Sequence, residues 1–292
     1  MPCWNEILDE VDASVDVASF LNKKRLEYFR SINKITGRNV IAYYSAWLKH
    51  PENTSIDEQD KNAFMSSVYK LDRTKGLDLI LHTPGGDIAA TESIVTYLKS
   101  IFNKDIRAII PQISMSAGTM IALSCREIIM GEQSSLGPID PQFGGVACQA
   151  VLDEFRQAVK EVEENPSALG LWQTIISKYH PTFLGQCERA VTWSKKLMND
   201  WVSETNQNVE LAELEKLFLD HRESYSHSRH ISKASCKNVG LNITDLEANQ
   251  DLQDAVLSLH HCYMILLDKF PVSKIVENQN GNMFIQNFSG ES

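Results

Sequence analysis

The sequence lacks the features of a membrane-spanning or nucleic-acid-binding protein. No apolar run approaches the roughly 20 residues that a bilayer-spanning helix needs. Lys and Arg number 28 against 38 Asp and Glu, which gives a net charge of -10. This balance argues against non-specific binding to nucleic acid, because that affinity comes mainly from cationic side chains that neutralise phosphates. It is also poorly suited to anionic membrane surfaces.

The sequence also lacks paired cysteine spacing and cofactor motifs. Because its six cysteines are scattered, we expect reduced thiols in a cytoplasmic protein rather than a disulfide framework or a zinc site. No basic-then-apolar signal pattern follows Met1. His260 and His261 are neighbours on one predicted helix and point different ways, so no metal is expected. No ATP-binding loop appears, no cofactor is expected, and energy-dependent unfolding of a substrate would need a partner. The cysteines are Cys3, Cys125, Cys148, Cys187, Cys236 and Cys262.

Strand and helix patterns alternate in the middle of the chain. The apolar stretch Leu77–His82 precedes the amphipathic run Ile88–Ile101, and Ile106–Pro111 precedes a second apolar run. Such alternation predicts a parallel, buried sheet with crossover helices, an α/β fold. The chain has 292 residues with 43% hydrophobic and 23% charged residues, which is ordinary for a globular protein.

Two chemically unusual turns follow these strands. The first is Thr83-Pro-Gly-Gly-Asp87, and the second contains Ser114-Met-Ser-Ala-Gly-Thr119. Ligands of parallel sheets bind beyond the carboxyl ends of the strands, so both turns should open on the same rim. Glycines without Cβ let a substrate approach the main chain, and a helix N-terminus offers unpaired N–H groups. A hydroxyl nucleophile that faces backbone donors is the minimum equipment for acyl transfer.

These two turns, followed by Leu136-Gly-Pro-Ile-Asp-Pro-Gln142, resemble those of the Clp/crotonase-fold serine peptidases. Within that superfamily the chain is most similar to the signal peptide peptidase-like branch known as the serine dehydrogenase proteinase family. The resemblance implies a Clp/crotonase-like ββα-superhelix core with a mostly parallel sheet, plus a helical C-terminal extension. A looser likeness over 226–243 places the end of the shared fold near residue 246.

The resemblance divides the chain into three parts. Residues 1–36 form an N-terminal helical segment, 37–246 the Clp/crotonase-like peptidase domain, and 247–292 a C-terminal helix and hairpin. Asn280-Gly281 between two short apolar runs is a hairpin signal. Signal peptide peptidases are commonly membrane-anchored, and the absence of an apolar span sets this sequence apart from them.

The resemblance assigns the nucleophile to Ser116, which directly precedes Ala-Gly-Thr, rather than to Ser114. The backbone N–H groups of Gly85, Gly86 and Ala117 would form the oxyanion hole. The alternative is that Ser116 only caps the helix, as serine often does.

The base that a serine nucleophile needs is less evident. Clp-type proteases use a histidine shortly after the nucleophile helix, but no histidine lies between His82 and His180. Signal peptide peptidases use a lysine, which must be desolvated to become neutral. Lys160 has acidic neighbours, whereas Lys178 follows an apolar run, so we predict Lys178 as the base. Lys160 and His180 stay open as alternatives.

The leading hypothesis is therefore a soluble, cytoplasmic serine endopeptidase with a Ser116/Lys178 dyad, and the resemblance implies a homo-oligomer. Its substrate would be an extended peptide or unfolded protein, held along the strand edge after Gly86 by main-chain hydrogen bonds. One alternative is a crotonase-type acyl-CoA enzyme, which shares the oxyanion-hole design and would not need Ser116. Another is a non-catalytic assembly subunit that kept the fold. Neither nucleic acid nor a membrane span is expected.

Overall fold

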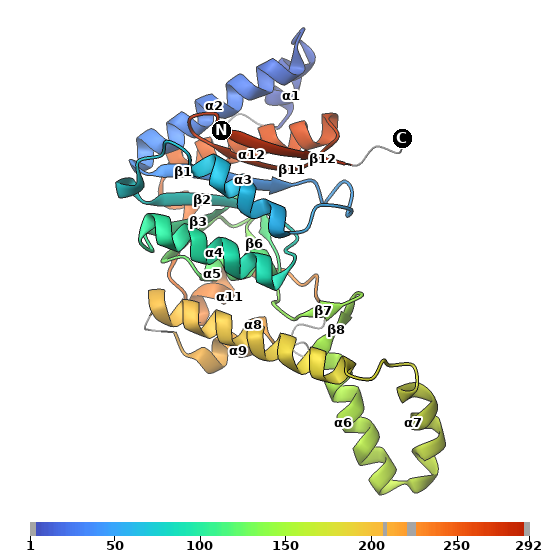
Figure 1. Cartoon of the computed structure of the whole chain (residues 1–292). Coiled ribbons are helices and arrows are strands. Elements are labelled where there is room, and N and C mark those ends of the chain that lie inside the picture. The colour runs from blue at the N-terminus through green and yellow to red at the C-terminus, as the bar shows by residue number, and fades with distance from the viewer. Residues whose placement is uncertain (1–3, 207–208, 221–225, 289–292) are drawn as a thin grey trace.

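The computed structural model describes residues 4–206, 209–220 and 226–288. Its central sheet consists of β1 (Asn39–Ser45), β2 (Leu77–His82), β3 (Ile106–Ile110), β5 (Glu127–Met130), β10 (Ile243–Asp245), β11 (Val272–Asn278) and β12 (Met283–Asn287). The strands lie in the order β10-β5-β3-β2-β1-β11-β12 (Figure 1). Neighbours from β10 to β1 pair in parallel, and the pairs β1–β11 and β11–β12 are antiparallel. The fold is thus mixed α/β with a mostly parallel central sheet.

Two small sheets stand apart from the central one. The first contains β4 (Ile113–Ser114), β6 (Ser135–Leu136) and β9 (Ile231–Ser232), and the second contains β7 (Gln142–Phe143) and β8 (Val146–Ala147). The α-helices are α1 (Trp4–Asp12), α2 (Val17–Thr36), α3 (Glu58–Val68), α4 (Ile88–Phe102), α5 (Ala117–Leu123), α6 (Cys148–Glu164), α7 (Leu169–Ile176), α8 (Phe183–Thr205), α9 (Leu211–Phe218), α11 (Lys233–Asn238) and α12 (Gln250–Lys269). Among the described residues, no helix is both long enough and apolar enough to cross a membrane.

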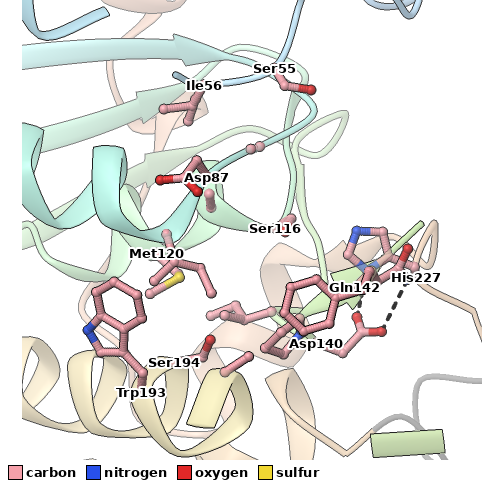
Figure 2. A pocket seen from close by; sticks show the side chains of 18 of the residues that line it. Ser55, Ile56, Asp87, Ser116, Met120, Asp140, Gln142, Trp193, Ser194 and His227 are labelled. Carbon is pink, nitrogen blue, oxygen red and sulfur yellow. Dashed lines mark hydrogen bonds and ion pairs between the residues drawn. The ribbon is translucent and has the colours of Figure 1, made fainter. Parts of the chain in front are cut away.

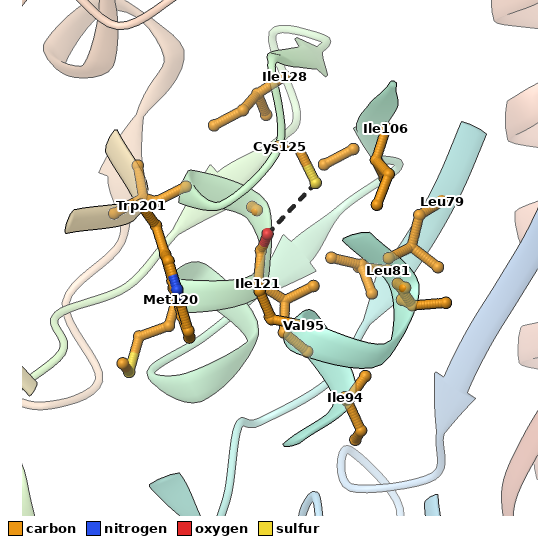
Figure 3. Close-up of a cluster of buried hydrophobic side chains, with 14 of the residues drawn as sticks. Leu79, Leu81, Ile94, Val95, Ile106, Met120, Ile121, Cys125, Ile128 and Trp201 are labelled. Atoms are coloured by element: carbon orange, nitrogen blue, oxygen red, sulfur yellow. Dashed lines mark hydrogen bonds between the residues drawn. The ribbon is translucent and has the colours of Figure 1, made fainter. Parts of the chain in front are cut away.

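Helices cover both faces of the central sheet, which gives three layers (Figure 1). Side chains alternate along β1: Ile41 and Tyr43 join the core under α3, α4, α5 and α8, whereas Ala42 and Tyr44 join the core under α1, α2 and α12. Figure 3 shows the first of these cores, in which side chains of β2, α4 and α5 meet Trp201 of α8. Burial on both faces explains why the central strands are continuous apolar runs.

The C-terminal hairpin belongs to the central sheet. Strand β11 pairs antiparallel with β1, with Val276 opposite Tyr43, and β12 extends the sheet beyond it. Gly281 at the turn has φ +81°, a conformation that glycine tolerates and that explains the Asn-Gly signal. Helix α12 packs on α2 on one face of this sheet (Figure 1). The domain boundary predicted at residue 246 therefore crosses a continuous sheet, and it stays a prediction.

The end of β2 carries a buried histidine, His82, whose burial bears on the stability of the fold at low pH. His82 is 0% exposed, and both of its ring nitrogens lack a hydrogen-bond partner among the described residues. The rings of Tyr44, Trp47 and His260 surround it. Burial lowers the pKa of His82 from 6.5 to about 4. The pKa of His260 is also well below its usual value, first because of burial and then because of its histidine neighbours.

We expect the protein to lose stability as the pH falls from about 6.5 to 4. In this window the unfolded chain binds a proton at His82 and the folded chain does not, so each step down in pH favours unfolding. For His82 alone the loss between pH 7 and pH 5 is about 2 kcal/mol of unfolding free energy. Urea denaturation at the two pH values measures it. His82→Leu should flatten this dependence, and His180→Leu at an exposed position should not. Equal slopes in the two variants would contradict the prediction.

Candidate active site

The two turns meet at one rim of the sheet, as the sequence predicts. Thr83, directly after β2, forms a parallel bridge with Ser114 of β4. The Met115 N–H donates to the Thr83 carbonyl at 2.9 Å, which fixes the second turn beside the first. The Asp87 side chain accepts from the Ala90 N–H at 2.8 Å and caps α4. The Gly-Gly turn and the serine turn are thus held side by side by backbone hydrogen bonds.

Ser116 has a strained backbone and no capping role. Its φ of 49° and ψ of -117° place a non-glycine residue in the conformation of the first central position of a type II′ turn. The residue stands at the N-cap of α5, yet its side chain makes no capping hydrogen bond. It is half-buried and lines the largest described pocket. Strain of this kind clusters at functional sites, whereas a capping serine would have bonded the helix.

The neighbouring Ser114 points into the protein interior. It is 0% exposed, and its hydroxyl lacks a hydrogen-bond partner among the described residues. A Cβ placed on Gly118 would lie 2.6 Å from Ser114 Oγ, so this glycine makes room for the buried hydroxyl. Of the two serines in the turn, only Ser116 lines the pocket.

The backbone donors near Ser116 are more restricted than the sequence suggests. The Gly85 N–H donates to Thr83 Oγ1 at 3.2 Å, so this donor is already engaged. Gly85 has φ +95°, and a Cβ on it would lie 2.7 Å from the Ala117 nitrogen and from Ser116 Cβ. In the described part of the chain, no hydrogen bond uses the Gly86 or Ala117 N–H. These two donors are therefore free for a ligand beside Ser116.

One side of the Gly-Gly turn is occupied by the chain itself. Ile56 bridges to Gly86: its N–H donates to the Gly85 carbonyl at 2.8 Å, and its carbonyl accepts from the Asp87 N–H at 2.9 Å. The sequence predicts that an extended substrate pairs with the edge after Gly86. Ile56 fills that side of the turn, so a substrate has only the side that faces Ser116.

Gly86→Ala is expected to destabilise the protein and to displace the backbone N–H of residue 86. A Cβ at this position would lie 2.3 Å from the Ile56 nitrogen and from its carbonyl oxygen, so the backbone must move. Overpacking of this kind costs on the order of 1–3 kcal/mol, and thermal denaturation measures it. Gly170→Ala in α7, where a Cβ meets no atom within 4 Å, is the control and should keep or raise stability. A Gly86→Ala protein as stable as the parent would contradict this packing.

The pocket beside the two turns has a volume of about 890 Å³. Its lining comes from the Gly-Gly turn, α5, the loop that follows β6, and α8 (Figure 2). The lining residues from the two turns and from the helices that follow them are Pro84, Gly85, Gly86, Asp87, Ile88, Ser116, Ala117 and Met120. The remaining lining residues are Ser55, Ile56, Ile139, Asp140, Pro141, Gln142, Phe143, Gln186, Arg189, Ala190, Trp193, Ser194 and His227.

A histidine–aspartate pair lies in this pocket. His227 Nδ1 is 2.6 Å from Asp140 Oδ1, and Gln142 Nε2 donates to the other carboxylate oxygen at 3.4 Å (Figure 2). The Asp140 side chain is 5% exposed and that of His227 is 33% exposed. A carboxylate only accepts, so the bond takes the Nδ1–H of the ring and leaves Nε2 as the acceptor. His227, Asp140 and Ser116 all line this pocket, so the pair is a candidate for a base with its orienting group.

The sequence pattern gave His227 no role. The histidine lies far downstream of Ser116, and Asp140 between two prolines reads as a turn residue. The one sequence feature that points to this region is the segment that starts at Ser226, which resembles the late part of signal peptide peptidases. That segment returns to the site because β9 pairs antiparallel with β6, the strand that precedes Asp140.

The lysine candidates lie elsewhere. Lys178 follows α7 and is exposed, so the burial expected from its apolar neighbours is wrong. The helices α6 and α7 form an arm that projects from the layered body (Figure 1), and the apolar run lies on this arm, where α7 contacts α6. Lys160 on α6 is exposed, and its Nζ lies 3.8 Å from Glu164 Oε1. His180 is exposed as well, and no lysine of the described residues lines the pocket. A role for Lys178 as base stays a prediction without support from its position.

Among the described residues, no cysteine lines the pocket. Within the described ranges, no group of three or more His, Cys, Asp and Glu residues is placed to hold a metal ion. Cys148 of α6 and Cys187 of α8 are buried free thiols. Burial, followed by the Cys187 thiol beside it, raises the pKa of Cys148 to about 12, so this thiol is a poor nucleophile.

Comparison with known proteins supplies the family. The model of the ClpP-like SDH-type serine proteinase family matches residues 15–178, which include Ser116 and Asp140 but not His227. Two similar proteins come from Methanocaldococcus jannaschii. Uncharacterized protein MJ0137 is 28% identical over 188 residues, which are 64% of this chain and 60% of that protein. Uncharacterized protein MJ1495 is 33% identical over 146 residues, 48% of this chain and 50% of that protein.

The chain thus spans less than two thirds of the length of either relative. The family model, in contrast, covers more than half of this chain and includes both turns that form the pocket. The chain belongs to the ClpP-like SDH-type serine proteinase family.

Proposed function

We propose that the chain is a serine endopeptidase in which Ser116 is the nucleophile, His227 is the general base and Asp140 orients that base. The N–H groups of Gly86 and Ala117 form the oxyanion hole. The observation that carries this proposal is the strained, uncapped Ser116 in a pocket that also contains two unengaged backbone donors. The family description, which is that of a serine proteinase, supports it.

The chemistry follows from these positions. The Ser116 hydroxyl oxygen attacks the carbonyl carbon of the scissile peptide bond, and its proton passes to Nε2 of His227. The negative charge that develops on the carbonyl oxygen is stabilised by the two N–H donors. The carbon–nitrogen bond then breaks as the leaving nitrogen takes the proton from His227, which leaves an acyl group on Ser116.

Deacylation uses the same groups in reverse. A water molecule gives a proton to His227 and attacks the acyl carbon, and Ser116 regains its proton as the acid leaves. Asp140 holds the ring through Nδ1 in both steps and stabilises the imidazolium that forms.

The proposed substrate is a peptide or an unfolded protein segment. An extended segment can approach the side of the Gly-Gly turn that faces Ser116, because Ile56 closes the other side. A cytoplasmic location and a homo-oligomeric state belong to the same proposal. The five described cysteines are free thiols, which suits a reducing compartment.

The test of this proposal is covalent labelling by a fluorophosphonate, which reacts with activated serines. We expect one adduct, mapped to Ser116 by mass spectrometry of the digested protein, together with hydrolysis of an unfolded protein such as casein. Ser114→Ala should label as the parent does. Absence of any adduct, with hydrolysis of an acyl-CoA thioester that survives Ser116→Ala, would overturn the proposal in favour of a crotonase-type enzyme.

A further inference from the structure

The pocket contains an apolar recess next to Ser116. Its lining residues are Met120 on α5, Ile139 on the loop after β6, and Ala190 and Trp193 on α8. Figure 2 labels Met120 and Trp193 among them. Met120 is 1% exposed and Ile139 2% exposed. Trp193 is 38% exposed, and its indole N–H donates to Glu92 on α4 at 3.1 Å, which links this wall to a second helix. A preformed apolar recess beside a nucleophile is suited to one side chain of the substrate.

One polar group lines this recess. Ser194 is 0% exposed, and its hydroxyl lacks a hydrogen-bond partner among the described residues. A buried hydroxyl without a partner is unfavourable, and ligand pockets commonly place a few such groups where they fix the ligand. The recess is therefore suited to a side chain that is apolar along its length and ends in a group that can form a hydrogen bond with the Ser194 hydroxyl.

We propose, on the basis of the proposed peptidase function, that this recess receives a tyrosine side chain of the substrate next to the scissile bond. The phenol is one donor and one acceptor, which matches the capacity of the Ser194 hydroxyl. The aromatic ring gains contacts with the Met120 sulfur and the Trp193 indole. Phenylalanine, leucine or methionine would leave the Ser194 hydroxyl unpaired.

Other polar side chains fit this recess less well. A glutamine amide carries more donors and acceptors than a single hydroxyl can satisfy. A lysine or arginine would need a carboxylate. Of the two on the pocket lining, Asp140 is bonded to His227 and Gln142, and Asp87 accepts from the Ala90 N–H as the cap of α4. An acidic side chain in the recess would lie against the buried Met120 and Ile139, where burial disfavours its charge, whereas the cation on the pocket lining, Arg189, is exposed to solvent.

The first arm of the test is hydrolysis of two peptides that differ only in tyrosine or phenylalanine before the cleaved bond. We expect kcat/KM to favour tyrosine by on the order of tenfold or more, because a site that pairs with a hydroxyl rejects the analogue without it. Ser194→Ala should remove this preference by lowering the rate for the tyrosine peptide. Ser203→Ala, the same change at an exposed position of α8 outside the pocket, should keep it.

The second arm is independent of catalysis. Binding of N-acetyltyrosinamide and N-acetylphenylalaninamide to the Ser116→Ala protein is measured by NMR shift changes, with and without Ser194→Ala. Tyrosine selectivity that depends on Ser194 without any hydrolysis would support the recess and contradict the peptidase. Hydrolysis that depends on Ser116, with no selectivity between the two probes in either arm, would overturn the recess and leave the peptidase standing.

Discussion

His227→Ala is expected to lower kcat/KM for peptide hydrolysis by on the order of a thousandfold or more, because the Ser116 hydroxyl then has no group to accept its proton. Asp140→Asn should cause a loss of similar order. The amide introduced by this change can donate to Nδ1, which would place the ring proton on Nε2 and remove the acceptor that the proposed mechanism uses. Initial rates on a fluorogenic peptide, with enzyme concentration set by active-site titration, measure both variants.

The matched controls are the lysine candidates. Lys178→Met and Lys160→Met change exposed side chains outside the pocket, so activity should stay within about twofold of the parent, as surface substitutions usually do. An inactive Lys178→Met protein alongside an active His227→Ala protein would return the base to Lys178. That result would leave the Ser116 assignment in place.

Most of the sheet and the two turns at its rim could be predicted from the sequence because each depends on local signals. Apolar runs predict β2 and β3, and the Gly-Gly and Ser-Ala-Gly turns follow them. Chain order alone then brings the turns together, since parallel strands end at one rim. The pocket lined by Gly86 and Ser116 confirms that expectation.

The proposed base could not be predicted in the same way because its position depends on tertiary pairing. The match between β6 and β9 involves only two residues on each strand, Ser135–Leu136 and Ile231–Ser232. No periodicity in so short a segment shows that His227 returns to Asp140. A local apolar run favours Lys178 as the base, but that run lies on the projecting arm. There the apolar neighbours leave the Lys178 side chain exposed.

The backbone donors proposed for the oxyanion hole show a related limit of prediction from the sequence. The sequence treats Gly85 and Gly86 as equivalent, whereas the structure engages the Gly85 N–H with Thr83 Oγ1 and leaves the Gly86 N–H unengaged within the described residues. The occupation of the outer edge by Ile56 is also a tertiary contact. Both details reduce the space in which a substrate carbonyl can lie.

Ser116→Ala should abolish peptide hydrolysis, leaving at most the background rate, and Ser114→Ala should keep the activity of the parent. Ser114 Oγ is buried without a partner among the described residues, so its removal costs little and can be slightly stabilising. Activity lost in Ser114→Ala and kept in Ser116→Ala would show that the two serines were assigned in the wrong order.

Variants of Ser116 also test whether its backbone is strained, because strain and helix capping predict different orders of stability. Ser116→Gly should also be inactive, yet it should be more stable than Ser116→Ala by on the order of 1–2 kcal/mol, because glycine tolerates the φ of 49° that alanine does not. If Ser116 served mainly as a helix cap, the parent would be the most stable of the three proteins. Thermal and urea denaturation of parent, alanine and glycine variants decide between these orders. A glycine variant that is inactive and more stable than the parent would show that the fold holds Ser116 in a strained conformation at the expense of stability, as expected of a nucleophile rather than of a cap.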